Sequence, residues 1–169
     1  MSRIKVEELE IGDNLKVINV GGQVKYYTIT AVDEIFYRDE HSSLSAQSEE
    51  DYSEVTALDP PEDQIYCITT IETNSNIKIY VKQPAATNRF GTNRSPEGGM
   101  LIDLTSSLMN ARKVNIWISA NNPPAVKVVN PTNVTITPVI WWIGRRFAVR
   151  ELEKKPEVYK TVRIGGIGS

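Results

Sequence analysis

The residues best suited to acid–base chemistry in this sequence are Asp39, Glu40 and His41. A catalytic histidine needs an orienting carboxylate and a nucleophile within hydrogen-bonding reach. These three residues occur in the most polar stretch of the chain, where no apolar wall is expected to shift a pKa. The sequence therefore predicts a surface loop here, and we assign no catalytic residue.

Metal-binding and phosphate-binding patterns are missing from the sequence. His41 is the single histidine and Cys67 the single cysteine, which excludes a two-histidine site, a cysteine-based zinc site and an internal disulfide. The acidic run 49–51 lacks the alternating ligands and turn glycine of a calcium loop. The glycine-rich run 165–168 precedes no helix that could cradle a phosphate. We expect no metal and no cofactor, and we expect Cys67, within an apolar run, to be a buried small hydrophobe.

Aromatic and basic residues towards the C-terminal end are candidates for binding. Adjacent strand residues point to opposite faces, so one of Trp141 and Trp142 is expected in the core and the other outside, unless both faces are covered. An exposed indole would anchor a partner protein or a sugar ring. The basic end can also attract the acidic stretch 33–63 of another copy. The predicted contact residues are Trp141, Trp142, Arg145, Arg146, Tyr159, Val162, Ile164, Arg89, Phe90 and Arg94.

The bulk composition fits an ordinary globular protein. The 169 residues are 40% hydrophobic and 24% charged, and the net charge is −2. This balance disfavours nucleic acid and anionic lipid as partners. No apolar run reaches the roughly 18 residues of a membrane helix, and the N-terminus lacks the apolar segment of a signal peptide. We therefore expect no membrane span, and synthesis in the cytoplasm.

The first third of the chain predicts a hairpin followed by an acidic connector. Two apolar runs within residues 15–32 flank a pair of glycines, which tolerate the positive φ of a tight turn. Residues 33–63 then hold eleven acidic residues against one basic residue, Arg38. The part from 40 to 53 is expected to be a long extended loop, either a solvated connector or an acidic contact strip.

After residue 63, apolar and polar residues alternate with the period of half-buried strands. In the run 77–82, Ile77, Ile79 and Val81 are expected to face the core, while Lys78 and Lys82 face water. Strands are predicted over residues 65–72, 77–82, 100–104, 114–119, 125–129 and 134–143. An irregular loop over 83–99, a helical turn over 105–110 and a helix over 147–155 complete the pattern.

Many short strands with little helix predict a mainly β fold, an antiparallel β-sandwich. We divide the chain into an N-terminal β-hairpin region with its acidic loop (1–63), a β-sandwich (64–152) and an extended C-terminal arm (153–169). The glycine-rich end of the arm is not expected to be ordered without a partner.

The run from Ile65 to Val149 resembles the small, jelly-roll-like β-sandwich proteins of virus and phage particles, such as capsid-decoration, spike and tail proteins. The resemblance rests on short strands rich in Val, Ile and Thr, on Asn-Pro turns at 121–124 and 130–133, on one long loop and on extended termini. It covers about half the chain. It implies many symmetric copies, no cofactor, no catalytic residues, and a location in the virion after synthesis in the host cytoplasm.

The leading hypothesis is therefore a non-enzymatic structural protein whose partners are copies of itself and other structural proteins. One alternative is a carbohydrate-binding module that uses an outward aromatic residue such as Trp117 or Trp142. Another is a small-barrel adaptor for nucleic acid or protein built on residues 1–58. A hydrolase with Ser or Asp groups from scattered loops is the remaining alternative.

Overall fold

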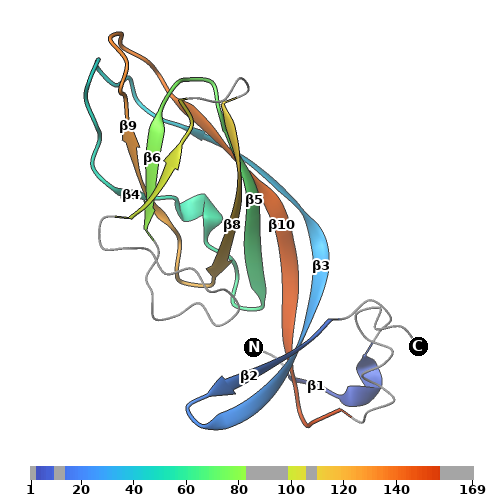
Figure 1. The fold of residues 1–169 in the computed structure, drawn as a ribbon. Coiled ribbons are helices and arrows are strands. Elements are labelled where there is room, and N and C mark those ends of the chain that lie inside the picture. The colour runs from blue at the N-terminus through green and yellow to red at the C-terminus, as the bar shows by residue number, and fades with distance from the viewer. Residues whose placement is uncertain (1–2, 10–13, 83–98, 106–109, 157–169) are drawn as a thin grey trace.

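A computed structural model describes residues 3–9, 14–82, 99–105 and 110–156. Strands dominate these residues, and the helical elements among them are two short 3-10 helices (Figure 1). The strands are β1 (Arg3–Ile4), β2 (Asn14–Val20), β3 (Gln23–Glu40), β4 (Ser53–Glu54), β5 (Gln64–Thr73), β6 (Lys78–Lys82), β7 (Met100–Asp103), β8 (Ala111–Ser119), β9 (Ala125–Val129) and β10 (Val139–Leu152). The 3-10 helices are η1 (Val6–Glu8) and η2 (Thr56–Leu58). The prediction of a mainly β fold is confirmed.

The strands form two sheets. The larger sheet has the order β2-β3-β10-β5-β8, with β1 pairing beside β10, and the smaller sheet has the order β4-β9-β6-β7. All pairings among the described strands are antiparallel except that of β1 with β10, which is parallel. Figure 1 shows the smaller sheet beside one end of the larger one, while β3 and β10 run on to a hairpin at the other end.

The two sheets have matching strand orders. Reading across them, β3 lies in the position of β4, β10 in that of β9, β5 in that of β6, and β8 in that of β7. The two strands of each matched pair are consecutive in the chain, so each of these four strands of the larger sheet is directly followed or preceded by its counterpart in the smaller sheet. This arrangement of eight strands is the strand order of a jelly roll, which confirms the predicted sandwich class.

The N-terminal hairpin is confirmed, but its second strand is longer than predicted. Gly21 and Gly22 have φ of 58° and 84°, as a tight turn between β2 and β3 requires. The strand β3 continues through the acidic residues 33–40 instead of ending at residue 32. Pairing with β10 explains the extension, because Asp33 to Glu40 lie opposite Arg146 to Val139. Residues 14–40 are thus two strands of the larger sheet and not a separate barrel.

The long loop predicted after β3 is firmly attached to the chain that leads into β10. The amide N–H of Leu44 donates to the carbonyl of Ile136 at 2.7 Å, and the reverse bond is 3.0 Å long. The side chain of Asn130, fully buried, donates to the carbonyls of Leu44, Ser45 and Val134 at 3.1, 2.9 and 2.8 Å. We call residues 41–52 and 130–138 together the crossing ribbon, because they pass side by side from one sheet to the other.

The end of the sandwich also differs from the sequence prediction. Residues 147–152 belong to the strand β10 and not to a helix, because β3 pairs with this stretch as far as Glu151. The strand predicted from residue 134 begins only at Val139. Pro138 has no amide hydrogen to donate to a neighbouring strand. Residues 134–138 accordingly form no regular strand, and their one β-bridge joins Ile136 to Leu44.

Two hydrophobic clusters lie on opposite faces of β10. The main core fills the space between the sheets and includes Ile140 and Trp142. A smaller cluster near the hairpin centres on Tyr27, Ile65 and Val149, with Phe147 and Trp117 packed against it. Successive strand residues face opposite ways, so β10 supplies even-numbered residues to one cluster and odd-numbered residues to the other.

The alternation predicted for residues 77–82 is confirmed on its apolar side. Ile77, Ile79 and Val81 are buried in the main core, while Lys78 and Lys82 are half-buried. Most of the predicted loop 83–99, most of the helical turn 105–110, and the arm from residue 157 onwards lie outside the described residues.

Candidate functional site

The most concentrated set of ionisable side chains surrounds His41, where β3 leads into the crossing ribbon. The ring Nε2 lies 3.0 Å from Asp39 Oδ2, and Nδ1 lies 2.8 Å from Glu50 Oε1. The indole Nε1–H of Trp142 donates to the same oxygen of Asp39 at 3.4 Å. The histidine side chain is 8% exposed, so the prediction of a solvated surface loop was wrong here. We call Asp39, His41, Glu50 and Trp142 the histidine cluster.

Within the histidine cluster, His41 itself carries a positive charge. Burial lowers the pKa of His41, but hydrogen bonds and charge interactions with Asp39 and Glu50 outweigh it and raise the pKa to about 9. The imidazolium form therefore predominates at neutral pH, with both ring nitrogens facing carboxylates. A general base needs a free ring nitrogen and a pKa near the working pH. The arrangement is suited to holding two chain segments together, not to moving protons.

A second set of residues stands out on the face of the larger sheet that points away from the smaller one. Phe36 is 70% exposed, and its neighbours Ile35 and Tyr37 point the other way, into or against the main core. On β10, Ile143 lies opposite Phe36, and Trp141 lies two residues further along. Both are half-buried. We call the outward side chains of residues 34, 36, 38, 70, 72, 141, 143 and 145 the outer face.

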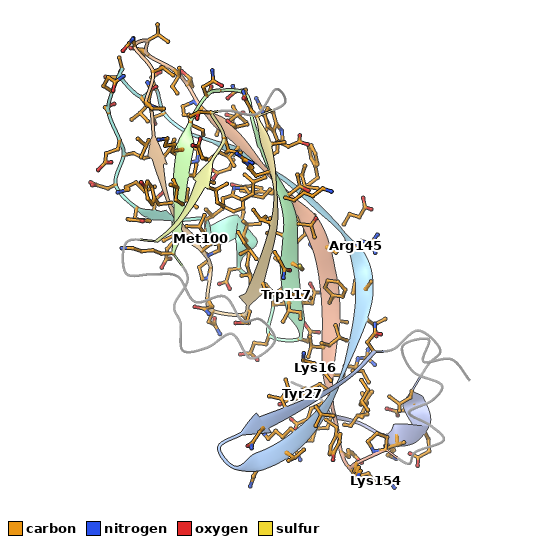
Figure 2. All side chains as sticks on the ribbon, in the orientation of Figure 1. Lys16, Tyr27, Met100, Trp117, Arg145 and Lys154 are labelled. Carbon is orange, nitrogen blue, oxygen red and sulfur yellow. The ribbon has the colours of Figure 1, made fainter. Side chains whose placement is uncertain are left out.

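Charged residues surround the aromatic part of the outer face. Glu34 lies opposite Arg145, and Arg38 lies opposite Trp141, whose other neighbour is Glu72 on β5. Arg38 forms an exposed ion pair with Glu40. Figure 2 shows Arg145 on the side of β10 that is remote from the smaller sheet. Acidic and basic side chains thus alternate around an apolar middle.

The structure separates the two adjacent tryptophans, as expected from their positions in a strand. Trp142 is fully buried in the main core, so it is not available as the surface anchor we predicted. Trp141 is half-buried on the outer face and Arg145 is exposed. Arg146 contacts Asp33 at 3.1 Å and lies over the ring of Tyr66. Tyr159, Val162, Ile164, Arg89, Phe90 and Arg94 lie outside the described residues.

Two of the residues that matter most here, Phe36 and Glu50, are not indicated by the sequence alone. Phe36 was not selected because the stretch around it is rich in acids, although Ile35, Phe36 and Tyr37 continue the alternation of the strand before them. Glu50 lies in the stretch 40–53, for which the sequence predicts a long extended loop, and nothing in its local sequence indicates that it reaches His41. Only the pairing within the crossing ribbon brings these segments together.

Trp117, the other aromatic candidate for sugar binding, packs against Phe147 with ring centroids 5.6 Å apart. It is half-buried at the edge of the smaller cluster (Figure 2). Cys67 is buried, as predicted, and burial raises the pKa of its thiol. It contacts Asn115 Oδ1 at 3.5 Å.

Within the residues that the structure describes, no three His, Cys, Asp or Glu side chains are grouped so that they could bind a metal ion. No helix in the same ranges has the length and apolar character needed to cross a membrane. Comparison with known protein families finds no matching model, and comparison with curated proteins finds no significant match.

Proposed function

We propose that this chain is a non-enzymatic structural protein of a virus or phage particle, and that it acts through symmetric contacts with copies of itself and with other structural proteins. Its place of action would then be the virion, after synthesis in the host cytoplasm. The proposal is supported by the outer face, by the strand order and by the histidine cluster.

The outer face carries most of this proposal. Phe36 is 70% exposed on the part of β3 that borders the larger sheet, and it forms one apolar patch with Ile143 and Trp141; such patches mark interaction sites, whereas single exposed residues do not. Around Phe36 lie a half-buried tryptophan, an isoleucine and two arginines, and aromatic residues and arginine are enriched at protein interfaces. Because the backbone of β3, β10 and β5 is paired on both sides of β10, this surface is rigid before binding, and little entropy is lost when a partner docks.

The strand order adds general support. Jelly rolls are frequent in viral capsid proteins, although lectin domains and other proteins share the fold. In the histidine cluster, carboxylates contact both nitrogens of His41, which fits a structural use of this side chain better than a catalytic one.

The test is the state of the full chain in solution. Sedimentation velocity over a wide range of concentration, with negative-stain electron microscopy of the same samples, should detect defined oligomers or ordered particles. A structural role would be contradicted by a chain that stays monomeric throughout and forms no particle, alone or on salt addition.

Carbohydrate binding is the second candidate, favoured by the position of Trp141. This indole is partly exposed between Arg38 and Glu72, whose polar groups could hydrogen-bond to sugar hydroxyls. A glycan array would test it. Binding that is lost in Trp141→Ala and kept in Trp117→Phe would support it, and an array without binding would exclude it.

A further inference from the structure

The outer face is open over the part of the chain that the structure describes. Phe36, Ile143 and Trp141 point away from the main core, and the opposite side of the same strands carries Ile35, Ile140 and Trp142, which are buried against the smaller sheet. On this side of β3 and β10, Glu34, Phe36, Arg38 and Arg145 are exposed, while Trp141 and Ile143 are half-buried.

The outer face has three rows of side chains across its strands. The middle row consists of Phe36, Ile143 and Thr70, and it continues to the exposed Lys113 on the edge strand β8. One flanking row holds Glu34 and Arg145, and the other holds Arg38, Trp141 and Glu72. Neighbouring rows are two residues apart along a strand, or about 7 Å.

Charge distribution indicates the class of partner. Glu34 and Glu72 balance Arg38 and Arg145, so the face has no net charge that would attract nucleic acid or anionic lipid. A mixed-charge surface with an aromatic centre matches a protein that has the opposite charge at each position. The face itself provides such a pattern when it is turned around.

We propose that the outer face binds the outer face of a second copy of this chain, around a two-fold axis that runs along the middle row. The inference rests on the proposed structural role and names the contact by which two copies of the chain first associate. Rotation about this axis exchanges the two flanking rows, while each strand of the face lies over the same strand of the second copy. Phe36 then meets Phe36 of the second copy, and Ile143 meets Ile143 of the second copy.

The exchange of flanking rows creates complementary pairs. Glu34 faces Arg38 of the second copy, and by symmetry Arg38 faces Glu34. Arg145 faces Trp141 of the second copy, where the guanidinium can lie over the indole. The existing ion pair between Arg38 and Glu40 is solvent-exposed and does not prevent the arginine from contacting a second carboxylate. The contacts of Glu34 with Arg38 and of Arg145 with Trp141 each occur twice in the dimer, and the Phe36–Phe36 and Ile143–Ile143 contacts on the axis occur once.

Two substitutions in the full chain test the apolar centre. Phe36→Asp should raise the dimer dissociation constant at least ten-fold, because it places two carboxylates against each other at the axis. Val134→Asp is the matched control, since Val134 is 62% exposed but lies in the crossing ribbon, and it should leave the constant unchanged. Sedimentation velocity measures both, and circular dichroism checks that both variants are folded.

A charge exchange tests the two-fold arrangement itself. Glu34→Arg brings a second guanidinium against Arg38 of the other copy, and Arg38→Glu places two acids together, so each variant alone should lose self-association. An equimolar mixture of the two variants should dimerise again, because both pairs between positions 34 and 38 are then of opposite charge. Native mass spectrometry distinguishes the mixed dimer from the two homodimers.

The outcomes separate this inference from the proposed function. Weak association of each single variant and recovery in the mixture support the two-fold contact. A chain that assembles equally well with Phe36→Asp, or whose charge variants associate like the wild type, overturns this contact and leaves the structural role. A wild-type chain that never associates overturns both.

Discussion

His41 is a charged side chain held inside the structure between two carboxylates and beside an indole. The charged form is favoured in the folded state, since its pKa there is about 9 against an ordinary value of 6.5. The stabilisation is therefore fully present below pH 6.5 and is lost as the pH rises through 9. The shift corresponds to about 3 kcal/mol of folding free energy.

The prediction is that the wild type loses about 3 kcal/mol more stability than His41→Gln when the pH is raised across this window. Glutamine removes the titrating group and leaves the tyrosines and lysines that also titrate at high pH. Urea unfolding of both proteins, below pH 6.5 and above pH 9, gives the difference. Parallel pH profiles for the two proteins would show that His41 carries no linked stability.

Gly144 is fixed by close packing within the sheet. A Cβ at this position would lie 1.9 Å from the carbonyl oxygen of Cys67 and 2.8 Å from the Cα of Ile68. The register of β10 against β5 shifts between Ile143 and Gly144, and this irregularity brings the backbones together. Only glycine fits this approach without moving a strand.

Gly144→Ala should therefore destabilise the protein by about 3 kcal/mol or more, because backbone atoms cannot yield as a flexible side chain can. Arg145→Ala, at the exposed neighbouring position, is the control and should change stability by less than about 0.5 kcal/mol. Chemical denaturation followed by tryptophan fluorescence compares the three proteins. An unchanged midpoint for the glycine variant would mean that the strands adjust freely.

At the scale of elements, the crossing ribbon connects the two sheets, and Asn130 is its central tie. Its amide nitrogen donates to three carbonyls, while its Oδ1 accepts from the backbone N–H and the hydroxyl of Thr132 at 3.0 and 2.6 Å. An aspartate carboxylate has the same shape as this amide. Its oxygen could still accept the two bonds from Thr132, but it has no hydrogen to donate to the three carbonyls.

We predict that Asn130→Asp costs about 3 kcal/mol of stability at neutral pH, since it buries a charge and leaves three carbonyls without their donor. Asn133→Asp, in the exposed turn beside it, is the matched control and should be close to neutral. Thermal unfolding monitored by circular dichroism tests the pair. Equal melting temperatures for the two variants would show that the ribbon does not depend on this amide.

Sequence patterns predicted elements wherever the residues of the element carry the pattern themselves. Alternation within 77–82 identified β6, and the two glycines identified the hairpin. The extension of β3 was missed because Asp33, Glu34 and Arg38 resemble a loop until the distant strand β10 is known to pair with them. For the same reason residues 147–152 resembled a helix. Their apolar positions fit both the helical and the strand period, and the pairing with β3 makes this stretch a strand.

The candidate site could be predicted only in part. The separation of Trp141 and Trp142 follows from strand geometry alone, without any distant partner. Which of the two indoles would be buried does not follow, because it depends on the face that the smaller sheet covers. The histidine cluster was beyond prediction, since Glu50 reaches His41 only because residues 41–50 pair with residues 128–138.

For the whole molecule, stability should be unevenly distributed. Among the described residues, the main core contains eighteen buried hydrophobic residues, and the cluster near the hairpin contains three. The strand β2 pairs only with β3 among the described strands, and Val17 and Val24 in this hairpin are more than half exposed. Local opening of the hairpin thus exposes little apolar surface.

Hydrogen exchange should reveal this difference. Backbone amides in the β2–β3 hairpin are expected to exchange at least ten-fold faster than those of residues 140–143 in β10, because local opening needs less free energy than opening of the main core. Exchange measured by mass spectrometry at neutral pH resolves these segments. Uniform protection along β3 and β10 would instead mean that both ends unfold as one unit.

The position of β10 has a consequence for how the protein is made. This strand is translated after the other nine described strands, yet it lies in the middle of the larger sheet and pairs with both β3 and β5. Until it leaves the ribosome, β3 and β5 have no neighbour between them, and their unsatisfied edges can capture other nascent chains. Slow translation or bound chaperones should therefore matter most just before residues 139–152 emerge, when a polypeptide with every other described strand still lacks its central one.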